Sequence, residues 1–213
     1  MALVGTNNLS TAIIILGIAV IVVFVSDKRY MQFVWIAAAG AGMMALFLGM
    51  ESYRLERIAI WKNPEAYEKG YQTIQGLYAI GSGGLFGRGF GESIQKLGFV
   101  PEAQNDMIFS IICEELGFVG ATILMLVFLV LIWRFMVIAV HAPDLFGSLI
   151  AAGAMGHIAI QVILNVAVVT NTIPNTGITL PFISYGGTSV LFLLSEMGLV
   201  LAVSRWQSEK KCI

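Results

Sequence analysis

The chain has 213 residues, of which 58% are hydrophobic and only 12% are charged. Soluble domains carry about twice that charged fraction, so the composition excludes an ordinary soluble enzyme and favours a membrane protein. The formal net charge of −1 gives no argument for nucleic acid, which we therefore do not expect as a partner, and the two cysteines form neither a disulfide framework nor a metal-ligand motif.

Five apolar stretches are long enough to cross a bilayer, whose hydrocarbon core of about 30 Å needs roughly 20 helical residues. We therefore predict an all-α integral membrane protein, a polytopic helical bundle that forms a single membrane domain over residues 1–213. The polar segment 51–106 is predicted to be one large loop of short amphipathic helices. The predicted spans are residues 9–25, 31–50, 107–133, 145–170 and 178–204.

The basic residues outside the polar loop predict the orientation of the spans. They lie in short connections and at the carboxyl end, which five spans place on one side of the membrane. The positive-inside rule makes that side cytoplasmic, so we expect a cytoplasmic C-terminus and an extracytoplasmic loop 51–106. These basic residues are Lys28, Arg29, Arg134, Arg205, Lys210 and Lys211.

The first eight residues carry no positive charge, so they do not form the basic start of a signal peptide. This uncharged lead and the short first span are what we expect of the carboxyl-terminal part of a longer protein. A natural five-span protein with a translocated N-terminus is the alternative.

The polar loop has its own predicted organisation. Residues 51–61 place apolar side chains at helical spacing among charges, which predicts an amphipathic helix along the membrane surface. Pro64 after Asn63 predicts that the chain caps and restarts a helix there. Six glycines from Gly81 to Gly91 exclude an ordinary helix and allow close approach of the backbone to a ligand or another segment. Turns that link short surface helices are the alternative to a phosphate-binding loop, because the spacing of nucleotide-binding motifs is absent.

Two acids close the loop. Glu102 and Asp106 directly precede the apolar run 107–113, so they are expected where water meets the membrane. Burial at such a boundary raises a carboxyl pKa and makes a general base useful near neutral pH.

Polar residues also interrupt the predicted spans. His157, Gln161 and Asn165 follow at intervals of four residues and form one polar stripe along the fourth span. The stripe could line a cavity for a polar headgroup, and hydrogen bonding between helices is the favoured alternative. Glu196 is costly in lipid, so we expect it to pair with a helix outside this chain or to lie near the inner face.

The start of the last span is broken by Pro181 and the pair Gly186–Gly187. Irregular backbone at membrane depth survives where it is packed in protein or lines a cavity. Together with Ser184 and Tyr185 this segment could shape the floor of a substrate groove, and a turn that starts the helix explains the pattern nearly as well.

Two long motifs lie far apart in the chain. They read GYQ at 70–72, AIGSGG at 79–84, QKLGFVPEAQNDMIF at 95–109 and EELG at 114–117, then PNTGITLPFISYGGTS at 174–189 and SR at 204–205. This series resembles the SEDS family of FtsW, RodA and SpoVE proteins across essentially the whole chain. Asn175 after Pro174 favours the FtsW and SpoVE branch.

The resemblance implies a peptidoglycan glycosyltransferase of the bacterial cytoplasmic membrane that polymerises lipid II during division, elongation or sporulation. The family's partners are a class B penicillin-binding protein transpeptidase and other division or elongation proteins. Its fold has ten membrane helices, with both ends cytoplasmic and the catalytic aspartate in the large outer loop after the seventh. This chain matches from about the sixth helix onward, so we expect it to be inactive by itself.

By the same resemblance Asp106 matches the catalytic aspartate, and we assign it the role of general base. Glu102 is the second candidate, which orients the acceptor, binds a metal ion or holds the loop. Gln104–Asn105 stands where the family often has His-Thr, so neither residue is expected to carry indispensable acid–base chemistry. The departing pyrophosphate needs cations or a metal ion, which makes Mg²⁺ or Mn²⁺ the candidate cofactor with unknown ligands.

The predicted substrate-binding residues combine cations with glycines and the broken helix start. The two cations suit an anionic pyrophosphate, and the glycines allow close approach. The alternative for each cation is a salt bridge with Glu92 or Glu102. The residues assigned to substrate binding are Lys96, Arg88, Gly83, Gly84, Ser184 and Tyr185.

Two other functions stay open. Spans with polar groups and a broken helix also fit a lipid II flippase, although a transporter binds its substrate near the midplane and does not need an outer loop that carries acids. A truncated, non-catalytic scaffold for the class B penicillin-binding protein is the second alternative.

Overall fold

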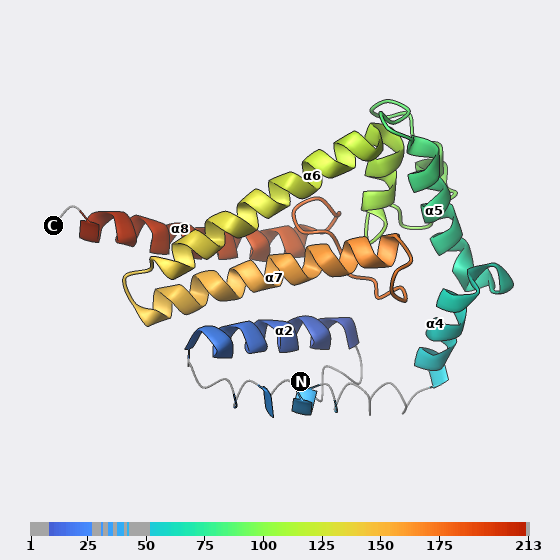
Figure 1. Cartoon of the computed structure of the whole chain (residues 1–213). Helices are drawn as coiled ribbons and strands as arrows, with labels where there is room; N and C mark the ends of the chain where they lie inside the picture. Colours follow the sequence, from blue (N-terminus) through green and yellow to red (C-terminus); the bar gives the residue numbers. More distant parts are fainter. Residues whose placement is uncertain are drawn as a thin grey trace. The chain divides into compact units, whose positions relative to one another are not determined.

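The computed structural model describes residues 9–26, isolated positions between 31 and 42, and residues 52–211. This part of the chain is helical and contains no strand (Figure 1). Its helices are α2 (Leu9–Ser26), α4 (Ser52–Lys62), α5 (Tyr71–Gly83), α6 (Ile108–Val140), α7 (Leu145–Val169) and α8 (Gly187–Lys211), with the 3₁₀ turns η1 (Pro64–Ala66), η2 (Glu68–Gly70) and η3 (Gln95–Leu97).

Three described helices have the length and apolar composition to cross a membrane: α6, α7 and α8 as far as Gln207. The apolar part of α2, Thr11–Ser26, is shorter. Large apolar side chains such as Phe118, Ile163 and Phe192 are exposed on the long helices, which is how lipid-facing surfaces look without lipid. The prediction of an all-helical membrane protein is therefore confirmed. The predicted span 31–50 lies outside the continuously described residues.

The chain divides into two compact units. The described residues of 1–47, 129–160 and 187–213 form the first, and those of 48–128 and 161–186 form the second. Both α6 and α7 therefore contribute residues to each unit.

Small residues bring α2 and α7 together in the first unit. A Cβ atom added to Gly17 would overlap Ile160, and one added to Gly156 would contact Ile21 closely. Membrane helices gain no hydrophobic drive from packing against each other, so close backbone approach at such small residues supplies the contact.

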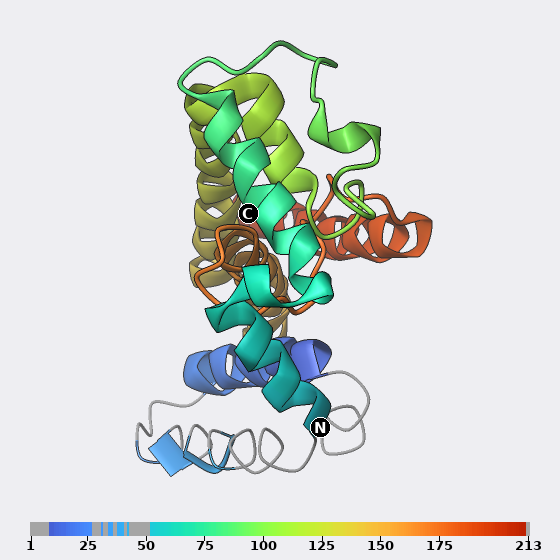
Figure 2. The same ribbon diagram turned by 90° about the vertical axis from the view of Figure 1, so that its right-hand side faces the viewer.

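In the second unit α5 packs against the start of α6 (Figure 2). Gly76 lies against Met107, and Gly83 lies directly on the backbone of Cys113, where no Cβ atom fits. The predicted amphipathic helix is α4, which begins at Ser52 and ends at Lys62. It holds the segment after α7, because Trp61 Nε1 donates to the Asn171 carbonyl oxygen over 2.9 Å. A restart at Pro64 is confirmed as the short turn η1, although Asn63 makes no side-chain cap.

Helix α6 is interrupted at Gly117, whose φ of +69° and ψ of −170° are not helical. A left-handed φ of this kind is accessible to glycine at little cost. The break frees backbone groups on both sides, and the glycine-rich loop satisfies them. The bonds run from Arg88 N to Glu114 O (2.9 Å), Gly89 N to Glu115 O (3.0 Å), Phe118 N to Gly84 O (2.9 Å) and Val119 N to Leu85 O (3.0 Å).

Three predictions about where the helices begin and end, or about where helix is excluded, are wrong. The last helix begins at Gly187 rather than at 178, because Pro181 and a left-handed Phe182 (φ +63°) keep the preceding residues in turns. Helix α6 continues to Val140, so Arg134 lies within a helix rather than in a connection. The glycine run does not exclude helix throughout, since α5 continues to Gly83 before the chain turns.

Candidate functional site

Asp106 closes the polar loop in the second unit, two residues before α6 begins. Its side chain is half-buried, and Gln72 of α5 donates from Nε2 to Asp106 Oδ1 over 3.3 Å. The same Nε2 donates to the Pro101 carbonyl oxygen over 3.2 Å, so Gln72 contacts both ends of the 101–106 turn. Glu102 within that turn is exposed and has a left-handed φ of +49°. The two acids predicted as catalytic therefore lie in one short turn beside α5.

The pKa of Asp106 is raised above the ordinary carboxyl value, chiefly because burial disfavours the charged form. The negative charge of Glu102 acts in the same direction. Hydrogen bonds from the backbone of Asp106 itself and from the side chains of Asn175 and Gln72 act in the opposite direction and do not cancel the rise. A carboxylate with a raised pKa is a stronger base, which is what the sequence predicted for this position.

Three consecutive carbonyl groups of the Asp106 turn are held by the segment that follows α7 and by α7 itself. Tyr185 N donates to Gln104 O over 2.8 Å, and Ser184 Oγ donates to Asn105 O over 2.6 Å. The third is Asp106 O, which accepts from Asn165 Nδ2 over 2.8 Å. The hydroxyl of Ser184 also accepts from the backbone N–H of Leu180 over 2.7 Å.

Of the two residues assigned to a substrate groove at this segment, only Tyr185 has a largely exposed side chain. Tyr185 is 78% exposed, whereas Ser184 is buried and its hydroxyl both donates to and accepts from the backbone. Ser184 therefore supports the turn that carries Asp106. A role for it as a direct substrate ligand stays a prediction.

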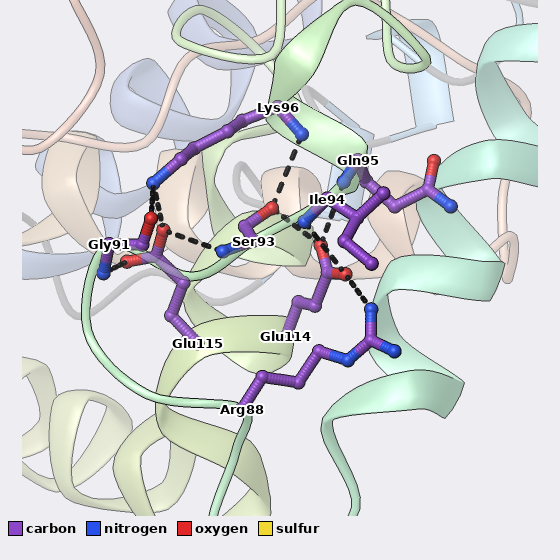
Figure 3. A network of polar contacts seen from close by, with 8 residues as sticks. All are labelled: Arg88, Gly91, Ser93, Ile94, Gln95, Lys96, Glu114 and Glu115. Atoms are coloured by element: carbon purple, nitrogen blue, oxygen red, sulfur yellow. Dashed lines mark hydrogen bonds and ion pairs between the residues drawn. The ribbon is translucent and has the colours of Figure 1, made fainter.

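The two cations assigned to pyrophosphate binding lie in a separate polar network at the start of α6 (Figure 3). Arg88 Nη1 contacts Glu114 Oε1 at 3.1 Å, and Lys96 Nζ contacts Glu115 Oε1 at 2.7 Å. The salt-bridge partners named from the sequence, Glu92 and Glu102, are wrong in both cases. The adjacent acids of α6 take their place because the loop folds over the helix start.

Glu114 is the centre of this network and is fully buried. Its carboxylate accepts from Ser93 Oγ (2.5 Å), from the backbone N–H groups of Ile94 and Gln95 (3.3 Å each) and from Arg88. A buried carboxylate with several donors, one of them charged, stabilises the structure around it. Glu114 and Glu115 thus anchor the polar loop to the first turns of α6.

The two glycines assigned to substrate binding have identifiable backbone roles. Gly83 lies against the Cys113 carbonyl oxygen, which explains why only glycine fits there. Gly84 has a left-handed φ of +56°, and its carbonyl accepts from Phe118 N. Both residues thus bring the loop onto α6, and contact with a ligand stays a prediction for each.

No metal-ligand set can be assigned from the described residues. Among them no three His, Cys, Asp or Glu side chains lie close enough together to hold an ion. The Asp106 turn offers the pair Asp106 and Glu102, and Glu102 Oε2 already accepts from Asn105 Nδ2 over 2.9 Å. These two carboxylates alone do not make up a ligand set for a metal ion.

The polar stripe of α7 divides between two kinds of partner. In the first unit His157 Nδ1 lies 2.8 Å from Glu196 Oε1 of α8, so Glu196 has a partner within this chain, and the expected pairing with a helix outside this chain is wrong. In the second unit Asn165 bonds to the Asp106 turn and to Ile178 O (2.7 Å). The favoured interpretation of the stripe, hydrogen bonding between helices, is therefore confirmed for His157, whereas Asn165 bonds to non-helical segments.

Comparison with known proteins shows the family of the chain. The family model of FtsW, RodA and SpoVE, described as "Cell cycle protein", matches residues 1–209. The chain belongs to this family. Stage V sporulation protein E of Bacillus subtilis (strain 168) is 47% identical over 202 residues, which are 93% of this chain and 55% of that protein. A protein of Trichlorobacter lovleyi named "Probable peptidoglycan glycosyltransferase FtsW" is 41% identical over 204 residues, covering 92% and 52% of the two chains.

Two solved structures agree with the fold. A chain in the structure "Structural coordination of polymerization and crosslinking by a peptidoglycan synthase complex" has a TM-score of 0.74 at 30% identity, covering 95% of this chain and 57% of that one. The rod shape determining protein RodA of Thermus thermophilus gives a TM-score of 0.61 at 29% identity, covering 93% and 50%. The chain thus spans about half the length of the relatives it matches.

Proposed function

We propose that this chain carries the catalytic aspartate of a membrane-bound peptidoglycan glycosyltransferase whose substrate is lipid II. The names of relatives at 47% and 41% identity support a role in this family of cell-wall proteins. The observation that carries the assignment of the base is the half-buried Asp106, with its raised pKa, in a turn held on two sides.

The reaction sets a specific demand on Asp106. A sugar hydroxyl oxygen forms a bond to an anomeric carbon, and the bond from that carbon to the lipid pyrophosphate breaks with its electron pair leaving on the pyrophosphate oxygen. The hydroxyl proton must be taken up as the new bond forms. Asp106 accepts it, and the raised pKa strengthens that acceptance.

Glu102 takes a secondary role in this proposal. Its charge raises the pKa of Asp106, and its own oxygen accepts from Asn105 within the turn. Glu102 therefore tunes the base and shapes the turn, and the proton passes to Asp106. We keep Lys96 and Arg88 as proposed contacts of the departing pyrophosphate. To bind it, each cation must either contact its glutamate and the pyrophosphate at once or leave the glutamate, Glu115 for Lys96 and Glu114 for Arg88.

The proposal extends to a partner and to the orientation in the membrane. A class B penicillin-binding protein is the proposed partner, which is supported by the likeness to a chain of a synthase complex that joins polymerization with crosslinking.

The loop 51–106 is placed outside and the C-terminus in the cytoplasm. Single cysteines at Ser82 and Ser208, in a background without Cys113 and Cys212, should label from opposite sides with an impermeant thiol reagent. Labelling of both from one side contradicts the placement.

The decisive experiment is Asp106→Asn in the full-length protein with its transpeptidase partner. Asn keeps the volume but cannot accept the proton, so glycan polymerisation from lipid II should fall by about 10²–10⁴-fold. Glu65→Gln, which neutralises an exposed acid in η1 of the same loop, is the matched control and should leave the rate unchanged. Near-normal polymerisation by Asp106→Asn contradicts the proposal and favours the flippase alternative.

A further inference from the structure

The carbonyl groups of residues 104, 105 and 106 each accept a hydrogen bond from a different group of the segment 165–185. Two of these donors are side chains, Asn165 Nδ2 and Ser184 Oγ, at 2.8 and 2.6 Å. All of these residues belong to the second unit. The backbone of the Asp106 turn is thus fixed from one side by a segment about 60 to 80 residues further along the chain.

Asn165 commits its whole donor capacity to this contact. Its side chain is fully buried, and its amide nitrogen donates both hydrogens, one to Asp106 O and one to Ile178 O. An amide nitrogen has two donors, so this side chain joins the turn to the extended stretch after α7 with none left over. Among the described residues its oxygen has no hydrogen-bond partner, so the burial of this amide carries a cost.

Left-handed backbone occurs on both sides of the contact. Glu102 in the turn has a φ of +49°, and Phe182 in the opposing segment has a φ of +63°. Non-glycine residues adopt such angles only where the surroundings hold them, and they cluster at functional sites. The hydrogen bonds of Ser184 to Leu180 N and Asn105 O hold both strained stretches together.

We infer that Asn165 and Ser184 are positioning residues for Asp106: they hold the backbone of residues 104–106 so that the carboxylate faces the acceptor hydroxyl. This inference rests on the proposed function. Because both side chains bond to the backbone of the turn, the loss of either should lower the rate of the chemical step and leave substrate binding intact. A displacement of the base by about 1 Å can cost as much as 100-fold in rate.

The test measures kcat and KM for lipid II polymerisation by the full-length protein with its partner. Asn165→Leu removes both donors at nearly constant volume, and Ser184→Ala removes only the hydroxyl. Each should lower kcat by about 10- to 100-fold, with KM changed by less than about twofold. Thr170→Val is the control beside the end of the same helix, because the Thr170 hydroxyl bonds only to nearby residues of its own segment, and it should behave like the parent protein.

A double-variant comparison separates this inference from the proposed function. In an Asp106→Asn background, Asn165→Leu and Ser184→Ala should cause no further loss, since no base is left to position. If Asp106→Asn abolishes the reaction but Ser184→Ala leaves kcat unchanged, the positioning role is wrong and the proposed function stands. If Ser184→Ala raises KM at constant kcat, Ser184 is a substrate ligand instead. If Asp106→Asn has no effect, the proposed function itself fails.

Asn165→Leu could also fail to fold, and Ser184→Ala guards against this, because it deletes a single oxygen. A thermal unfolding midpoint for Ser184→Ala close to that of Thr170→Val, together with a lower kcat, supports positioning. If the activity falls only in proportion to the amount of folded protein, so that kcat per folded molecule equals that of the parent, the positioning role is overturned.

Discussion

Asp106 and Glu114 are two carboxylates eight residues apart that the same polar loop surrounds in different ways. Glu114 is fully buried and accepts from a hydroxyl, two backbone amides and a guanidinium. Asp106 is half-buried, faces the amide of Gln72 and has the negative charge of Glu102 nearby. The donors around Glu114 thus include a charged group, whereas the hydrogen bonds to Asp106 do not cancel the effect of its burial.

This difference is consistent with a structural role for Glu114 and with the role proposed for Asp106. A carboxylate surrounded by strong donors holds its proton weakly and is a poor base, whereas burial without full compensation raises the pKa. The network of Glu114 therefore anchors the loop, whereas the turn of Asp106 carries the carboxyl group that we propose as the base. In the network of Glu114 the hydrogen bonds end on the carboxylate itself. In the turn of Asp106 the short hydrogen bonds from Asn165 and Ser184 end on backbone carbonyl groups.

The largest expected effect on stability is at the contact between α5 and α6. Gly83→Ala would place a Cβ atom on the Cys113 carbonyl oxygen, a backbone atom that cannot move aside. We expect a loss of about 3 kcal/mol or more, measured by thermal or denaturant unfolding in detergent. Gly81→Ala in the same helix has open space and should gain about 0.5–1 kcal/mol of helix propensity. Equal effects of the two substitutions would show that the close contact is absent.

Glu114→Gln should come next. It removes the charge that Ser93, Arg88 and two backbone amides share, and it adds an amide with no acceptor in place, so we expect a loss of about 1.5–3 kcal/mol. Polymerisation per folded molecule should change far less than in Asp106→Asn, which should lose no stability. A Glu114→Gln protein that is fully stable but inactive would reverse the comparison and make Glu114 the reactive acid.

The pH dependence of the rate should distinguish the two neighbours of Asp106. Polymerisation should rise with pH as the Asp106 carboxyl loses its proton, with a midpoint above the ordinary value of 3.8. Gln72→Leu removes a hydrogen bond that lowers the pKa, so the acid limb should move to higher pH. Glu102→Gln removes a charge that raises the pKa, so the limb should move to lower pH. Shifts in the same direction would contradict this arrangement.

Stability should follow pH through the same group with the opposite sign. Because burial raises the pKa of folded Asp106 above its unfolded value, the folded state binds the proton more tightly. Its contribution to stability is therefore present below the ordinary carboxyl pKa and is lost as the pH rises through the raised value. Unfolding midpoints of Asp106→Asn should lack this decline, and an unchanged profile would show that Asp106 does not titrate in this range.

The smallest expected effect on stability is that of Lys96→Met. The Lys96–Glu115 pair is partly exposed, so its loss should cost at most about 1 kcal/mol. A structural role alone predicts kinetics close to those of the parent. A higher KM for lipid II with unchanged stability would instead support the contact with pyrophosphate.

Several features of the fold could be predicted from local sequence. The long apolar runs predicted α7 almost to the residue, and the spacing of apolar residues among charges predicted α4. The start of α8 and the break in α6 could not be predicted in this way. A proline and a glycine allow a turn, but whether the chain turns there depends on the loop backbone that satisfies the freed groups, as at Gly117.

The site shows the same division. The position of Asp106 at the end of the loop, and its assignment as the base, followed from sequence and family resemblance. Gln72 lay within a recognised motif without an assigned role, and Asn165 was only part of a stripe. For Gln72 the sequence did hold a signal of a functional role, namely its place in the segment 70–72 that matches the family.

The sequence by itself determined that this is a helical membrane protein of the FtsW, RodA and SpoVE family with acids at the end of a polar loop. Hydrophobic length and motif order are local properties, which any stretch of chain carries before it folds. Only the tertiary structure decided that Glu114 is buried and hydrogen-bonded by the loop, that Glu196 pairs with His157, and that the segment 165–185 binds the backbone of the Asp106 turn. These outcomes depend on groups from 19 to 81 residues apart, and no local spacing specifies which of them meet.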